Sequence, residues 1–220
     1  MSDLREKQRR TREQTIIKAA DKLFQERGYA QTNVEDIAEV AEVGVATVYK
    51  YFGSKSGVLR ELMKPDLLAI RDAGEMVLLN PPLDPAEAVV ALLFAYQFRD
   101  HWAHKDLIRA MAGADFGYAG AFAALRREVD SFVLEQLGEL LENGQSRGSV
   151  RRHLDPQDMA VIIYAMLNHN FQEYVRVGDM STTVFQRNLR RHILLLFEGW
   201  RESETEKTAK GRSKRENRGY

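Results

Sequence analysis

The chain has 220 residues, of which 44% are hydrophobic and 29% charged, and this composition is typical of a folded protein with one large or two small domains. It has no cysteine, which excludes disulfides, thiolate metal sites and cysteine nucleophiles, and no apolar run approaches the ~20 residues of a membrane helix. The formal net charge is zero, but residues 1–64 and 201–220 are net positive while residues 65–200 are net negative.

The N-terminal segment is basic, and a first helix follows it. Five cations stand among the first twelve residues: Arg5, Lys7, Arg9, Arg10 and Arg12. Such a segment either lies along nucleic-acid phosphates or is a solvated chain end. Beyond it, Ile16, Ala20, Leu23 and Phe24 recur with helical spacing, which predicts a first helix that ends at Gly28. No apolar secretory region precedes this helix, so we expect a cytoplasmic protein without a membrane segment.

A second helix is predicted after Gly28. The sequence from Thr32 to Glu35 has the form of a capping box, in which the Thr32 hydroxyl and the Glu35 carboxylate satisfy unpaired amides of the first turn. Helical apolar spacing then runs from Val34 to Ala41. It breaks at residues 42–44, a three-residue turn that contains glycine.

A third short helix follows this turn, with Val48, Tyr51 and Phe52 on its inward side. It is predicted to end at Gly53, with Ser54 capping a fourth helix. Two short helices joined by a tight turn predict a helix-turn-helix, which places its second helix in the major groove of DNA.

The rest of the chain is also helical in pattern. Pro65 lies inside the fourth helical pattern and predicts a kink or a division there, of which the kink is favoured. Prolines 81, 82 and 85 indicate a loop. Further helices are predicted over residues 86–103, 105–112, 121–143, 156–176 and 182–201, separated by glycines that include Gly144. No segment alternates with a period of two residues, so the expected fold class is all-α, with a disordered basic tail over 203–220.

The outward side of the third helix has side chains that suit DNA. Methyl groups of Val45, Ala46 and Thr47 can meet thymine methyls, while hydroxyl and ammonium groups reach phosphates or a guanine edge. Lys55, at the N-terminus of the fourth helix, is expected to clamp a phosphate. The full set of candidate DNA-contacting residues is Thr32, Gly44, Val45, Ala46, Thr47, Tyr49, Lys50, Tyr51 and Lys55.

These residues resemble the DNA-binding head of TetR-type transcriptional regulators. The matching pattern comprises Ile17-x-x-Ala20, Leu23-Phe24-x-x-x-Gly28-Tyr29, Thr32-x-Val34-x-Asp36-Ile37-Ala38, Ala41, Val43, Thr47-Val48-Tyr49-x-Tyr51-Phe52-x-Ser54-Lys55 and Leu59. The resemblance implies a three-helix head on a larger helical body that binds a ligand and dimerises, and repression that a small molecule relieves. The turn departs from the family pattern, because Glu42 stands where glycine is usual and Gly44 where serine or threonine is usual.

The two C-terminal helices, 156–176 and 182–201, predict a homodimer. Both carry more apolar side chains than one neighbouring helix can cover, which favours a four-helix bundle formed by two chains. A purely monomeric core for these helices is the alternative.

The body also carries aromatic, methionine and histidine side chains that could line a cavity for a small apolar or aromatic ligand. The candidates are Phe98, His101, Trp102, Met111, Phe116, Phe122, Met166, His169 and Asn170. The pair His101-x-x-His104 is too unspecific to predict a metal site. No phosphate loop or nucleophile elbow is present, and no paired carboxylates stand at a plausible site mouth, so we expect neither a cofactor nor an enzyme.

The sequence therefore predicts a DNA-binding head over residues 1–53, a ligand-binding and dimerisation body over 54–202 and a tail over 203–220. The predicted function is a ligand-responsive regulator, a repressor of transcription, that binds double-stranded operator DNA. Two alternatives stay open at this stage: a helical carrier or enzyme whose head is a structural cap, and a regulator that does not respond to a ligand.

Overall fold

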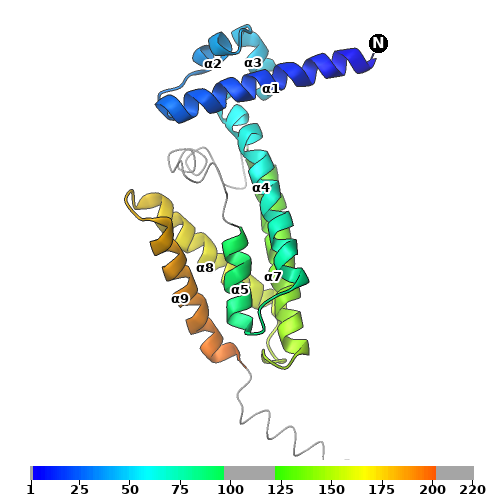
Figure 1. The fold of residues 1–220 in the computed structure, drawn as a ribbon, viewed down its shortest axis with the longest axis vertical. Coiled ribbons are helices and arrows are strands. Elements are labelled where there is room, and N and C mark those ends of the chain that lie inside the picture. The colour runs from blue at the N-terminus through cyan, green and yellow to red at the C-terminus, as the bar shows by residue number, and fades with distance from the viewer. Residues whose placement is uncertain (1, 97–121, 202–220) are drawn as a thin grey trace, which may run out of the picture. The chain divides into compact units, whose positions relative to one another are not determined.

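The computed structural model describes residues 2–96 and 122–201, and these residues form eight helices (Figure 1). The helices are α1 (Ser2–Arg27), α2 (Val34–Val40), α3 (Val45–Phe52), α4 (Lys55–Leu79), α5 (Pro85–Ala95), α7 (Ala123–Ser146), α8 (Pro156–Arg176) and α9 (Thr182–Trp200). The predicted all-α class is confirmed, and α8 has the predicted bounds. None of the helices in the described part of the chain has the length and apolar character needed to cross a bilayer.

The chain divides into two compact units. The first contains residues 1–71 and 97–131, and the second contains residues 72–96 and 132–220. Helices α4 and α7 each contribute residues to both units. The predicted helix over 105–112 and the predicted tail lie outside the described residues.

Helices α1, α2 and α3 share one hydrophobic core in the first unit, as the apolar spacing predicts. Its buried side chains include Ile16, Ala20, Leu23, Phe24, Ile37, Ala38, Val48 and Phe52. Burying each large apolar side chain contributes about 1.5–3 kcal/mol, so this cluster is sufficient to hold three short helices that would not be stable alone. α1 ends before Gly28, whose φ of 80° lies in the left-handed region that glycine adopts most easily.

The cap of α2 differs from the sequence prediction by one residue. Asn33, not Thr32, is the N-cap: its side-chain oxygen accepts from the Asp36 amide, and the Asp36 carboxylate accepts from the Asn33 amide. The capping box is therefore formed by Asn33 and Asp36, and Glu35 is exposed. Thr32 is unsuited to the cap because its hydroxyl donates to the Gly28 carbonyl at 2.9 Å.

Helix α4 is continuous from Lys55 to Leu79, with Pro65 in its interior and exposed to solvent. The proline does not divide the helix, although it removes the amide that would donate to the carbonyl four residues earlier. The predicted cap is confirmed, because the Gly57 amide donates to the Ser54 hydroxyl at 3.1 Å.

The second unit contains α5, α8, α9 and the adjoining parts of α4 and α7 (Figure 1). Helix α9 packs against both α5 and α8. Acidic and hydroxyl side chains cap these helices: Asp84 caps α5, Asp155 caps α8 and Ser181 caps α9. Two ion pairs join α9 and the residue after it to the start of α5, namely Arg190 with Glu87 and Arg201 with Asp84.

Gly144 does not end α7, contrary to the prediction. The helix continues to Ser146, and Gly148, with φ of 72°, lies in the turn that follows. Packing explains the glycine at position 144, because a β-carbon there would lie 2.7 Å from a methyl carbon of Val150. The returning chain at Val150 can therefore lie directly on the last turns of α7.

Candidate nucleic-acid interface

Helix α3 has one buried side and one accessible side. Val48 and Phe52 are buried, and Tyr51 is half-buried with its ring 6.3 Å from that of Phe52. The accessible side consists of Gly44, Val45, Ala46, Thr47, Tyr49 and Lys50. The Tyr49 side chain is 48% exposed, so this aromatic residue is not part of the hydrophobic core.

The accessible side of α3 has no carboxylate, since its sequence is VATVYKYF. It offers methyl groups, two hydroxyls and one ammonium, which are the groups that contact thymine methyls, phosphates and guanine edges. Gly44 is the N-cap of α3 and makes no side-chain hydrogen bond to its first amides, of which that of Thr47 donates to the Gly44 carbonyl at 2.8 Å.

The turn before α3 holds its shape through the backbone. Glu42 has φ of 53°, a left-handed conformation that is uncommon for a residue with a side chain. The Val43 amide donates to the Ala38 carbonyl at 3.0 Å, which closes the end of α2. Glu42, which stands where glycine is usual in the family pattern, thus adopts a conformation that suits glycine.

Thr32, one of the predicted DNA contacts, is only 1% exposed. Its hydroxyl donates to the Gly28 carbonyl within the loop that joins α1 to α2. Its side chain therefore fixes the loop, and it is not displayed on the surface of the head.

Lys55 is likewise engaged within the head. Its Nζ donates to the carbonyls of Tyr29, at 2.9 Å, and Thr32, at 2.8 Å. The same ammonium lies 4.3 Å from the centroid of the Tyr29 ring, a cation–π contact. Burial lowers the pKa of Lys55 from its ordinary value. Sequence reasoning missed these partners because they are more than twenty residues away along the chain.

Close packing also shapes the junction between α3 and α4. A β-carbon on Gly57 would overlap the carbonyl of Phe52, so only glycine fits the third position of α4. The head therefore requires glycine at position 57, which sequence reasoning did not identify. The only local signal is a glycine inside an otherwise regular helical pattern.

Four of the nine predicted ligand residues lie in the part of the chain that the structure describes, and they are divided between the two units. Phe98, His101, Trp102, Met111 and Phe116 lie outside the described residues, as does the pair His101 and His104. Phe122 is buried in the first unit. Met166, His169 and Asn170 belong to α8 in the second unit.

On α8 these three side chains differ in environment. Asn170 is buried, donates to the Met166 carbonyl at 2.8 Å and bonds Nδ1 of His192 at 3.2 Å. His169 is exposed, on the same side of the helix as Ile162 and Ala165. Asn170 thus joins α8 to α9, whereas His169 faces away from the core.

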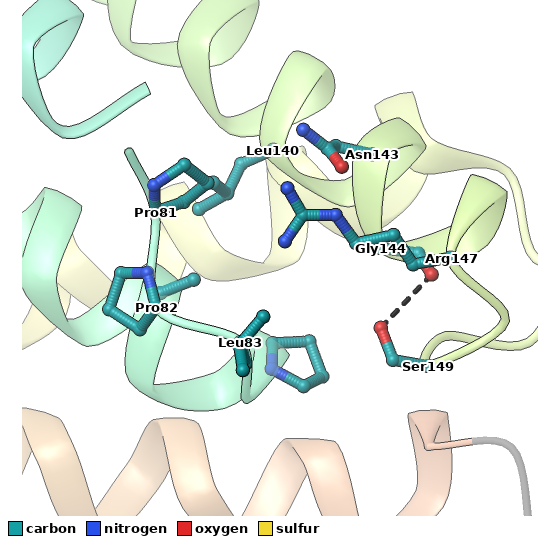
Figure 2. Close-up of a pocket in the computed structure, with 10 residues that line it drawn as sticks. Pro81, Pro82, Leu83, Leu140, Asn143, Gly144, Arg147 and Ser149 are labelled. Atoms are coloured by element: carbon teal, nitrogen blue, oxygen red, sulfur yellow. Dashed lines mark hydrogen bonds between the residues drawn. The ribbon is translucent and has the colours of Figure 1, made fainter. Parts of the chain in front are cut away.

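A small depression in the second unit lies elsewhere, between the proline loop and the end of α7 (Figure 2). Pro81, Pro82 and Leu83 form one wall, and Leu140 and Arg147 belong to the other. The bond from the Ser149 hydroxyl to the Gly144 carbonyl, 3.0 Å long, closes one end (Figure 2). The depression has room for about one water molecule and contains none of the predicted ligand residues.

Models of known protein families match both the N-terminal and the C-terminal part of the chain. Residues 16–62 match the model of bacterial regulatory proteins of the TetR family, and residues 85–194 match the model of the tetracyclin repressor-like C-terminal domain. The chain belongs to the TetR family. It is a helix-turn-helix transcriptional regulator and not an enzyme, and the second model assigns it the C-terminal domain of the family as well.

Individual relatives agree with this assignment. The chain is 25% identical over 204 residues to the HTH-type transcriptional repressor KstR of Rhodococcus jostii, an alignment that covers 92% of this chain and 91% of KstR. Among solved structures, a TetR-family regulator from Pectobacterium atrosepticum has a TM-score of 0.67 and 22% identity, covering 89% of this chain and 97% of that one. The Thermus thermophilus repressor FadR, solved with lauroyl-CoA, has a TM-score of 0.62 and 20% identity, covering 84% and 92%. At this identity the two structures show a common fold.

Proposed function

We propose that this TetR-family regulator represses transcription by binding operator DNA as a homodimer, with α3 in the major groove, and that a small, largely apolar organic molecule releases it. The observation that carries the DNA-binding part is the accessible side of α3. It displays Thr47, Tyr49 and Lys50 without any carboxylate, while Val48 and Phe52 of the same helix are buried. Repression is supported by KstR, which is a repressor.

The DNA contact is tested by fluorescence anisotropy with duplexes from the DNA beside the gene of this protein. Affinity should fall steeply with salt, because each phosphate contact releases counterions and contributes about 0.9 to the slope of log affinity against log salt. Lys50→Gln should weaken binding and reduce this slope. The matched control is Arg127→Gln, which removes one exposed positive charge from α7 and should leave affinity and slope unchanged. Equal effects of both variants would contradict the proposed docking of α3.

Dimerisation is supported by an apolar surface on α8 and α9. Val161, Ile162 and Leu195 are 54%, 46% and 57% exposed, although each lies on a helix whose other side forms the core of the second unit. A dimer would cover them, and two heads related by a two-fold axis can read half-sites about 34 Å apart. Exposed His169 lies on the same side of α8, so this interface would also cover it.

Analytical ultracentrifugation tests the dimer. The double variant Ile162→Arg/Leu195→Arg should sediment as a monomer, because two copies cannot bury four added guanidinium groups without partners. The control is Met76→Arg/Leu83→Arg, which changes two apolar side chains of 68% and 87% exposure that lie outside α8 and α9. A dimer in both variants would contradict the proposed interface.

The effector is expected to be a small apolar or aromatic molecule. Aromatic and methionine residues predicted from sequence indicate an apolar or aromatic molecule, and FadR provides an example of the fold with lauroyl-CoA bound. Long-chain acyl-CoA, free fatty acids and planar aromatic acids are therefore the first compounds to test. A true effector raises the melting temperature in proportion to log concentration above its Kd and also releases the labelled duplex. If none of these compounds does either, the proposed apolar effector is contradicted for these classes.

A further inference from the structure

Arg201, the last residue that the structure describes, is held at one place in the second unit. Its backbone forms an antiparallel bridge with Val150, in the turn between α7 and α8. The Arg151 amide donates to the Trp200 carbonyl at 3.0 Å, and the Arg151 guanidinium donates to the Arg201 carbonyl at 3.2 Å. The Arg201 guanidinium in turn bonds both carboxylate oxygens of Asp84, at 2.9 and 2.7 Å. The chain beyond residue 201 therefore starts from a fixed point.

The bridge also sets the direction in which the chain leaves this point. Arg201 has an extended backbone, with φ of −68° and ψ of 140°. The strands of an antiparallel pair run in opposite directions, so the chain after Arg201 is directed toward the residues that precede Val150. Two of these, Arg147 and Ser149, line the depression between the proline loop and the end of α7 (Figure 2). The C-terminal residues are thus directed toward this depression.

The depression offers one cation beside an apolar surface. Arg147 is exposed, and its guanidinium points toward Pro81 and Leu140 (Figure 2). In the described part of the chain, the Arg147 amide donates to the Asn143 carbonyl at 3.0 Å, whereas no partner is found for the guanidinium. Leu83, on the opposite wall, is 87% exposed. A partner that supplies a carboxylate beside an extended backbone would satisfy the cation and cover the leucine.

The chain itself carries such a segment directly after Arg201. Residues 202–206 read Glu-Ser-Glu-Thr-Glu, with a carboxylate at every second position and no cation. Alternate residues of an extended chain lie on the same side, so these glutamates can all face one surface. Glu204 is three residues beyond Arg201, about 10 Å of extended chain, and Arg147 is three residues before Val150. The middle carboxylate can therefore reach the Arg147 guanidinium.

We propose that the depression is the docking surface for the chain's own segment 202–206, with the Glu204 carboxylate paired with the Arg147 guanidinium and the backbone lying over Leu83. Docking would extend the link that Arg201 and Asp84 already make between the end of α9 and the start of α5. It would give the first residues of the predicted disordered tail a place on the second unit, and would leave the later basic residues outside the docked segment. This docking requires neither operator binding nor an effector, so it stands apart from the proposed function.

Because the chain has no cysteine, spin labels can be attached at single sites to measure this docking. One label is attached at Thr205→Cys in the segment and one at Glu135→Cys, an exposed position of α7 in the second unit. Double electron–electron resonance then measures the distance distribution between the two labels in the full chain. A docked segment gives a narrow distribution, and a released segment gives a broad one. Raising the salt concentration to about 1 M should broaden the distribution, because the Debye length falls to about 3 Å.

Variants in this labelled background test the assigned ion pair. Arg147→Gln should lower the ratio of the narrow to the broad component about twofold to fivefold, the range expected for the loss of one exposed ion pair. The matched control is Arg152→Gln, because Arg152 is an exposed cation of the same turn whose guanidinium donates to the Gln145 carbonyl at 3.2 Å. This control should leave the distribution unchanged. The exchanged pair Arg147→Glu/Glu204→Arg should restore the narrow component that Arg147→Glu alone removes.

Other outcomes overturn the docking in distinguishable ways. A broad distribution at low salt, before any change at Arg147, would show that the segment does not dock. Equal losses for Arg147→Gln and Arg152→Gln would show general attraction to a basic turn in place of the specific pair. If an excess of unlabelled chain removes the narrow component after subunit exchange, the docked segment belongs to a second copy and not to the same chain.

Discussion

The ammonium of Lys55 donates to the backbone carbonyl of Tyr29 at 2.9 Å and lies over the ring of the same residue. This contact joins the first turn of α4 to the loop between α1 and α2. Lys55 and this loop belong to the same compact unit. We therefore expect Lys55 to support DNA binding by holding the head together.

We expect Lys55→Met to destabilise the protein by about 1 kcal/mol, because two carbonyls lose a charged donor at a partly exposed site. The salt slope of DNA binding should remain as in the unaltered protein. A direct phosphate contact would instead lower that slope by about 0.9 per protomer. Lys64→Met, which alters an exposed lysine of α4, is the control for stability and slope.

The turn between α2 and α3 contains a strained residue that glycine should relieve. Glu42 has φ of 53°, so Glu42→Gly removes a steric cost of about 1–3 kcal/mol while adding about 0.5–1 kcal/mol of chain entropy to the unfolded state. The net expectation is a stabilisation of about 0.5–1 kcal/mol, measured by urea unfolding. Glu39→Gly, within α2, should be destabilising by about 1 kcal/mol. A loss of stability in both variants would show that the turn holds no strain.

Gly44 begins α3 without a side-chain cap, and its backbone already has the extended conformation of a capping residue, with φ of −69° and ψ of 142°. The nearest atom to an added β-carbon would be Oγ1 of Thr47, at 3.8 Å, so serine fits. We expect Gly44→Ser to stabilise the protein by a few tenths of a kcal/mol and to tighten DNA binding about twofold to threefold through the added hydroxyl. Gly44→Ala, which adds the carbon without the hydroxyl, should not tighten binding. Equal or weaker affinity of Gly44→Ser at fixed salt would contradict this expectation.

Local patterns in the sequence were sufficient for most of the fold. The spacing of Ile16, Ala20 and Leu23 identified the core side of α1, and the start of α8 was placed at Pro156, its first residue. These signals depend on neighbours within a few residues, where helical geometry fixes which side chains share a face. The accessible side of α3 could be predicted for the same reason, once Val48 and Phe52 were assigned to the core.

Features that depend on distant contacts could not be predicted in this way. Thr32 and Asn33 are both good capping residues, and the choice between them depends on the Thr32 hydroxyl bonding to the Gly28 carbonyl. Gly144 resembles a helix end until Val150 is seen to pack on it. Lys55 has the sequence context of a phosphate ligand, but its carbonyl partners come from a loop that only the tertiary structure brings close.

The core of the second unit contains a polar pair that should make stability sensitive to alkaline pH. The Tyr96 hydroxyl donates to Oε1 of Gln136 at 2.8 Å, and both side chains are buried. Gly74 of α4 lies against this pair, because a β-carbon there would collide with the Gln136 amide. The three residues therefore bring α4 and α7 together with the C-cap of α5.

Burial raises the pKa of Tyr96 far above its ordinary value, since the phenolate would have to exist in an apolar core. The protonated phenol is favoured in the folded protein, so this contribution to stability is complete below pH ~10, the ordinary pKa of tyrosine, and is progressively lost as the pH rises above it. We expect the free energy of unfolding to fall between pH 10 and pH 11 in the unaltered protein. Tyr96→Phe should cost about 1 kcal/mol at pH 7, because the hydrogen bond to Gln136 is lost.

The same substitution should also make the alkaline decline shallower, because phenylalanine cannot ionise. Urea unfolding at pH 7, 9.5 and 10.5 measures both effects. Tyr49→Phe is the control, since Tyr49 is exposed on α3 and its removal should change neither stability nor its pH dependence. If Tyr96→Phe and the unaltered protein decline in parallel above pH 10, other groups determine alkaline unfolding and the buried phenol contributes nothing to it.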